Sequence, residues 1–281
     1  MDRRSTTPNA RKPFCNSITG NLIVLVVAAT LSLLASGAIS AGDTPTNNSE
    51  LERNIRTFIQ SVVAVHNDAD YALWPVPVCP FVSGISPQQK DFVFTHLSGI
   101  AQAAGVLPTT ANCSPNMFIY FTPDPDALLV KLRHSDPRLF DTPNGVAPLN
   151  HFMNTARPIR VWYNDYIDSK VSGSRLVRDY IRLISNSIIV VDTKRIGNAN
   201  LGQVADYIAL VGLAEVNLDS DLGNAPTILR IFGSSGDEKI PGLTSWDQAL
   251  LRSMYRTPPR DATRLSEVET TAVRYVEEGS H

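Results

Sequence analysis

The run SIIVVD, residues 187–192, and the run LGQVADYIALVGLAE, residues 201–215, decide the fold of this chain. The first run is rich in β-branched residues and predicts a strand. The second predicts a helix, and because residues four apart lie on one helical face, Ala205 and Ala209 share a face. Alanine has the highest helix propensity. One interpretation is therefore an amphipathic core helix whose small alanine face packs closely on a sheet.

The register of the same helix gives a second interpretation. In the zinc-hydrolase motif HExxH, the first and last positions are imidazole ligands and the second is a general base; an extended form adds a glycine and a third ligand. Here Ala205 and Ala209 stand at the two histidine positions, and Asp206 stands at the glutamate position. Gly212 and Glu215 stand at the glycine and third-ligand positions. Because alanine has no lone pair to offer, we expect no zinc or other metal, and no cofactor.

The sequence after this helix supports the second interpretation. A hydrophobic segment, PTILRIF at residues 226–232, is followed by LTSWDQALLRSMYRT at residues 243–257. This order resembles secreted bacterial zincin-like metallopeptidase relatives of unknown function, in which the second helix ends in a Leu-Tyr pair; here Met254 and Tyr255 occupy that end. The resemblance covers residues 187–257 and implies a zincin-like C-terminal half. With ADYIA in place of HExxH, it implies a degenerate, pseudoenzyme form.

The first 41 residues predict export. Basic residues precede an apolar run, LIVLVVAATLSLLA at residues 22–35, and small residues at Ala38 and Ser40 offer a cleavage site. Cleavage would give a periplasmic or secreted protein. The alternative is an uncleaved inner-membrane anchor formed by residues 22–41, which approaches the length needed to span a bilayer. The polar segment GDTPTNNSE, residues 42–50, is expected to be a linker.

Two cysteines, Cys79 and Cys113, follow the export signal. In an exported chain an even number of cysteines favours a disulfide, so we predict that they are bonded to each other. The formal net charge is −2 and no block of like charge occurs, which argues against nucleic acid as a partner. The expected partner is an unidentified protein or envelope component, with membrane contact only if the N-terminal segment is retained.

Helical and strand patterns alternate along the rest of the chain. They predict an α+β or α/β fold in which a mixed sheet packs with helices. We divide the chain into an N-terminal α/β part, residues 51–165, and a zincin-like part, residues 166–281. Predicted helices span residues 49–66, 86–105, 201–215, 243–257 and 265–278, another begins near Asp124, and strands span 117–122, 158–164 and 187–192.

No other motif in the sequence identifies a catalytic site. His66, His96, His134 and His151 lack metal-ligand spacing, and we interpret His96 as a packed or surface residue. His134 directly precedes a segment rich in Pro, Asn and Asp, residues 135–156, and His151 lies within it; we expect this segment to be a functional loop. No GxSxG, P-loop or GxGxxG motif occurs. NLDSDLGN, residues 217–224, lacks the glutamate of an EF-hand and is expected to be a polar loop.

Three functions remain open. The first, which we favour, is a non-catalytic exported binding or envelope-associated protein on a degenerate zincin-like scaffold. The second is an active hydrolase that uses Asp206 and Glu215 with a histidine of the long loop, since carboxylates in different environments can act as acid and base. This requires the two carboxylates to face one cleft. The third is a membrane-tethered structural protein that retains residues 22–41.

Overall fold

A computed structural model of the chain describes residues 44–66, 71–107, 113–140, 146–170, 179–233, 240–256 and 265–279. The predicted signal peptide or anchor, residues 1–41, lies outside the described residues. Asp43–His281 form one compact unit. Within the described residues, no helix is both long enough and apolar enough to cross a membrane.

A five-stranded mixed sheet forms the centre of this unit, so the predicted fold class is confirmed. Its strand order is β1-β5-β3-β2. The remaining strand, β4, also pairs with β5 and lies outside this order. β4 is antiparallel to β5, whereas the other pairs are parallel. The strands are β1 (Ala72–Leu73), β2 (Pro80–Ser83), β3 (Met117–Thr122), β4 (Ile159–Lys170) and β5 (Asp179–Asp192).

Helices follow the carboxyl ends of three of the parallel strands, β2, β3 and β5. The side chain of Ser86 accepts a hydrogen bond from the backbone of Gln89 at the start of α2, and Gly105 ends that helix at a φ of 98°, as the sequence predicts. The helices are α1 (Thr44–Val62), α2 (Pro87–Ala104), α3 (Pro125–Ser135), α4 (Val146–Asn154), α5 (Leu201–Leu213), α6 (Ser245–Arg256) and α7 (Leu265–Glu278), with short 3₁₀ helices η1 (Pro137–Leu139) and η2 (Ile228–Arg230).

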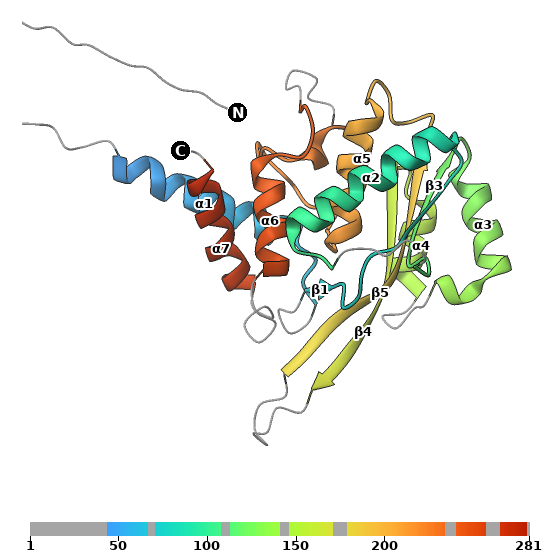
Figure 1. Ribbon diagram of the computed structural model, residues 1–281, viewed down its shortest axis with the longest axis horizontal. Helices are drawn as coiled ribbons and strands as arrows, with labels where there is room; N and C mark the ends of the chain where they lie inside the picture. The colour runs from blue at the N-terminus through green and yellow to red at the C-terminus, as the bar shows by residue number, and fades with distance from the viewer. Residues whose placement is uncertain are drawn as a thin grey trace, which may run out of the picture. The chain divides into compact units, whose positions relative to one another are not determined.

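The run SIIVVD in β5 is buried on both faces of the sheet. Ile189 and Val191 belong to the larger hydrophobic core, which includes residues of α2 and α5. Ile188 and Val190 belong to a smaller core with residues of α3 and α4. Figure 1 shows α2 and α5 on one side of the sheet and α3 on the other. Because both faces are covered here, residues 188–191 are continuously apolar rather than alternating.

The β4–β5 pair is longer than the sequence predicts. We expected the earlier strand to end at residue 164, but the pairing continues past a bulge between Asn164 and Asp165 to Lys170. In Figure 1 this part of the hairpin projects away from the helices. Residues 165–170 of β4, DYIDSK, do not have the apolar composition of a central strand. The neighbouring strand β5, rather than their own composition, therefore determines that they pair.

Three expectations about segment boundaries are wrong. The expected linker, residues 42–50, is largely helical because α1 begins at Thr44. Its polar residues 48–50 are exposed. They extend the N-terminal end of a helix whose later residues pack into the core. The expected boundary between residues 165 and 166 falls inside β4, so both parts contribute to one sheet. The expected loop 135–156 contains α4, which forms because Leu149 and Phe152 are buried on one face.

The predicted disulfide between Cys79 and Cys113 is confirmed. It joins the segment before β2 to the segment before β3, at the same end of two neighbouring parallel strands. The side chain of Asn116 reinforces this connection, since it accepts a hydrogen bond from the backbone N–H of Cys79 and donates one to the carbonyl oxygen of Pro77.

Candidate functional site

The alanine face of α5 packs into the protein core. Ala205 and Ala209 are completely buried, and Gly212 lies on the same face. A Cβ atom on Gly212 would lie 2.7 Å from Cε of Met117 on β3 and 3.3 Å from Cδ1 of Ile189 on β5. Small residues on this face therefore let the helix approach the sheet closely, as the core-helix interpretation expects.

The two carboxylates that we considered as a catalytic pair do not share a cleft. Glu215 lines a cavity beside β4, whereas Asp206 lines a different cavity between α2 and α6. Each binds a histidine: the His66 Nε2 to Glu215 Oε2 distance is 3.0 Å, and the His96 Nε2 to Asp206 Oδ1 distance is 2.6 Å. The arrangement therefore does not provide the one common cleft that the hydrolase hypothesis requires for these two carboxylates.

The cavity beside β4 has a volume of about 750 Å³ and is the candidate functional site. Four consecutive residues of the strand, from Arg160 to Tyr163, line it. Successive side chains of a strand point to opposite faces, so a cavity on one face would meet only alternate residues. This cavity therefore opens along the outer edge of β4. Its other walls are α4 and the two segments 63–66 and 215–219.

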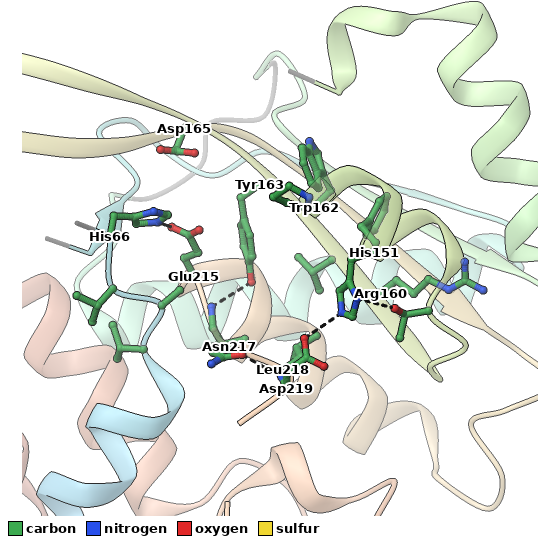
Figure 2. A pocket seen from close by; sticks show the side chains of 18 of the residues that line it. His66, His151, Arg160, Trp162, Tyr163, Asp165, Glu215, Asn217, Leu218 and Asp219 are labelled. Carbon is green, nitrogen blue, oxygen red and sulfur yellow. Dashed lines mark hydrogen bonds and ion pairs between the residues drawn. The ribbon is translucent and has the colours of Figure 1, made fainter. Parts of the chain in front are cut away.

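His66, Tyr163 and Glu215 form one end of the site (Figure 2). Because an ionised carboxylate can only accept hydrogen bonds, Nε2 of His66 donates to Glu215. The hydroxyl of Tyr163 donates to the carbonyl oxygen of Val211 at 2.6 Å. Burial, followed by the negative charge of Glu215, raises the pKa of Tyr163 well above its ordinary value. Tyr163 is thus a fixed hydrogen-bond donor at neutral pH.

His151 and Asp219 lie on the other side of Tyr163 (Figure 2). Nε2 of His151 is 3.0 Å from Oδ2 of Asp219, and its Nδ1 is 3.3 Å from the hydroxyl of Thr155. Arg157 binds the second oxygen of Asp219. Because both oxygens of Asp219 have protein partners, the segment 217–224 acts here as a polar loop rather than as a calcium loop.

Two arginines complete the lining of the site, Arg160, which is buried, and Arg182, which is partly exposed. Arg160 is 5% exposed; it forms an ion pair with Asp126 at 2.7 Å and donates to the carbonyl oxygen of Met153 at 2.7 Å. Arg182 pairs with Asp165. The Nε atom of each arginine is buried without a hydrogen-bond partner in the described structure. Every carboxylate, histidine and arginine of the lining thus pairs with a side chain of the complementary kind, while the Nε–H groups of Arg160 and Arg182 stay without a partner.

Sequence reasoning found only part of this site. It singled out Glu215 and named His151 as a residue of the long loop, but the partner of Glu215 is His66, which lies 149 residues earlier. His134 is at the end of α3 and does not line the cavity. No local sequence pattern predicts the pairing of His66 with Glu215 or of His151 with Asp219, because each depends on contacts between distant segments.

Within the described residues, no group of three or more His, Cys, Asp or Glu side chains is placed to hold a metal ion. Comparisons with known protein families, with curated proteins and with solved structures find no match for this chain. The resemblance to zincin-like metallopeptidases therefore stays a prediction, as does export. The chemistry of the site consists of fixed hydrogen-bond donors and acceptors beside an open strand edge.

Proposed function

We propose that the protein is an exported, non-catalytic binding protein that holds an extended peptide along the outer edge of β4. The observation that carries this proposal is the cavity lined by four consecutive residues of that strand, from Arg160 to Tyr163. Peptides that add to a sheet edge gain affinity from main-chain hydrogen bonds and specificity from pockets for alternate side chains.

The pairing of β4 indicates which backbone groups are free. The backbone N–H of Asp192 donates to the carbonyl oxygen of Pro158, so residues 158, 160 and 162 direct their peptide groups toward β5. The peptide groups of Val161 and Tyr163 consequently point to the outer edge. Among the described residues no strand pairs with that edge. A peptide paired along the six residues 160–165 would span about 17 Å between its first and last Cα atoms.

The side chains around the edge suit a peptide with polar groups on both faces. His66 and Glu215 would meet one face, and His151 and Asp219 the other. Because these groups already hold one another, they keep their positions before a ligand arrives, which lowers the entropic cost of binding.

The test is selection of ten-residue peptides from a displayed random library on the purified protein. Selected peptides are then synthesised with N-methyl groups at either the odd or the even positions. In strand addition only alternate N–H groups bond to the sheet edge, so one set of peptides should lose affinity at least tenfold and the other should retain it. Equal effects of both sets, or selection of no peptide, would exclude strand addition.

A protein variant gives an independent test of the same proposal. Val161→Pro removes an outward N–H without removing a bond to β5, and proline is tolerated at such edge positions. We expect this variant to lose peptide binding, whereas Val161→Ala, which keeps the N–H, binds like the original protein. Retained binding by the proline variant would contradict the proposal, provided that its melting temperature matches that of the alanine variant.

A second candidate is a peptide hydrolase, favoured by the presence of Glu215 with both His66 and His151 in one cavity. A histidine held by a carboxylate can act as a general base. The selected peptides are incubated with the protein and examined by mass spectrometry. Cleavage that disappears in Glu215→Gln but persists in Asp206→Asn would support the hydrolase; intact peptides would support the binding protein.

Export is tested separately. The confirmed disulfide supports an oxidising compartment. N-terminal sequencing of the native protein should give a start near residues 39–41. An intact N-terminus in a membrane fraction would support the tethered structural protein instead.

A further inference from the structure

A second cavity, of about 710 Å³, lies between α2, α6 and residues 241–243. It shares no lining residue with the cavity beside β4. Apolar or small residues form most of its wall, and polar groups lie among them. A cavity of this size with few polar groups is typical of a small-molecule site.

The polar groups include a fixed histidine–carboxylate pair. Asp206 accepts a hydrogen bond from Nε2 of His96 at 2.6 Å and another from the backbone N–H of Leu243 at 3.1 Å. The ring of His96 also stacks on Phe92, with ring centroids 5.4 Å apart and an interplanar angle of 18°. A Cβ atom on Gly242 would lie 2.3 Å from Oδ2 of Asp206, so the loop approaches the carboxylate as only glycine can. The negative charge of Asp206 is therefore already engaged.

The cation of this cavity has no such partner. Arg252 on α6 lines the cavity and is half-buried, and no group in the described part of the chain forms an ion pair or hydrogen bond with its guanidinium. The arginines of the β4 cavity, in contrast, are all paired. One turn further along α6, Arg256 donates to the carbonyl oxygen of Ala103, which lines the cavity, and adds positive charge beside it. The available charge attracts an anion.

Another part of the cavity wall is apolar and open. Gly99 and Ala103 lie four residues apart on α2 and line the cavity together with Ile100 and Leu251. A Cβ atom built on Gly99 would meet no atom within 4 Å, so the space in front of this residue is unfilled. An alkyl or aromatic group could occupy it without displacing a side chain, and would gain affinity from the burial of apolar surface.

We propose that this cavity binds a small amphipathic monocarboxylate, with its carboxylate paired to Arg252 and its apolar body against Gly99 and Ala103. The nearby Asp206 carboxylate repels additional negative charge, so a monoanion fits better than a phosphate dianion. This site is independent of the peptide site at β4 and does not rest on the function proposed above.

The experiment is calorimetric titration of the purified protein with decanoate. Decanol, which lacks the charge, and acetate, which lacks the chain, are the comparison ligands. We expect one decanoate per chain, at least tenfold tighter than either of them. The tripeptide acetyl-Gly-Gly-Leu, which carries a free carboxylate, tests a peptide C-terminus as the source of the same chemistry. Tighter binding of this peptide than of decanoate would overturn the assignment to a small molecule.

Two variants locate the binding. Arg252→Gln should weaken decanoate at least tenfold, whereas Arg274→Gln, which changes an exposed arginine on α7, should leave binding unchanged. Gly99→Leu fills the open space and replaces a helix-interior glycine, so it should abolish binding without lowering the melting temperature. Undiminished decanoate binding in either Arg252→Gln or Gly99→Leu, or no binding to the original protein, would overturn the proposal.

Discussion

The hydroxyl group of Tyr163 on β4 donates a hydrogen bond of 2.6 Å to the carbonyl oxygen of Val211 in the last turn of α5. The same hydroxyl lies 3.1 Å from the carbonyl oxygen of Ala214. The last carbonyl groups of a helix have no partner within the helix itself. Tyr163 therefore connects the end of α5 to the strand edge and fixes the position of Glu215, which follows directly.

We expect Tyr163→Phe to lower the free energy of unfolding by about 1–3 kcal/mol, because buried carbonyl groups lose their donor. Urea denaturation measures this change. Tyr166→Phe is the matched control, since Tyr166 is 47% exposed and its hydroxyl should contribute little. Equal stabilities of the two variants would mean that the contact to Val211 does not stabilise the fold.

Buried tyrosines should make the protein sensitive to alkaline pH. Burial is the largest cause of a raised pKa at Tyr163, Tyr207 and Tyr255. An acid whose pKa is higher in the folded state binds more protons there, so stability is full below the unfolded pKa of about 10 and falls as pH rises above it. Each tyrosine contributes a slope of up to about 1.4 kcal/mol per pH unit.

This prediction is measured by urea denaturation at pH 8 to 11, together with the absorbance of tyrosinate. The free energy of unfolding should be nearly level to pH 9.5 and then fall. In Tyr163→Phe the free energy of unfolding should fall less steeply with pH, because one of the three buried tyrosines no longer contributes. A level profile to pH 11 would mean that these hydroxyl groups ionise as easily in the folded protein as in the unfolded chain.

Local signals made much of the fold predictable. Ser86, Gln89 and Gly105 define the two ends of α2, and the hydrogen bonds that do so span at most five residues. The strand at residues 117–122 and the disulfide were equally evident, because composition and cysteine number were enough. Such features can be predicted because the relevant contacts lie within a few residues, or because few pairings exist.

The site could not be predicted in the same way. His66 and Glu215 meet only because segment 63–66 runs beside segment 215–217, where Val63 and Val216 form an isolated antiparallel bridge. Nothing near either residue specifies that bridge. The spacing of Ala205 and Ala209 was ambiguous for another reason: one periodicity serves both close packing and a ligand register, and only burial distinguishes them.

Loss of the disulfide should destabilise the protein without changing its fold. On the chain-entropy account, closure of the loop between Cys79 and Cys113 contributes roughly 4 kcal/mol. We expect Cys79→Ser/Cys113→Ser to lower the free energy of unfolding by about that amount, and reduction of the original protein to have the same effect. The double variant itself should be insensitive to reductant. A reductant-independent stability of the original protein would show that the bond does not form.

Restoring histidines to α5 distinguishes a core helix from a vacated zinc site. Ala205 and Ala209 are completely buried, and Glu215 is engaged by His66 at the edge of a different space. We expect Ala205→His/Ala209→His to lower the free energy of unfolding by about 4 kcal/mol or more, because two imidazoles overfill the core and bury polar atoms. Zinc should not restore the loss. The measurement is thermal and urea denaturation with zinc and with chelator.

The control for this experiment is Lys90→His/Phe94→His, which places the same spacing on an outward-facing part of α2, where Phe94 is 37% exposed. A histidine pair there can bind zinc weakly and should change stability little, so it shows that the spacing itself is harmless. Zinc that binds only the folded protein adds its binding free energy to the stability. If zinc stabilised the α5 variant by several kcal/mol in this way, the alanine face would have to be the remnant of a metal site. If the variant unfolds regardless of zinc, close packing against β3 and β5 accounts for both alanines.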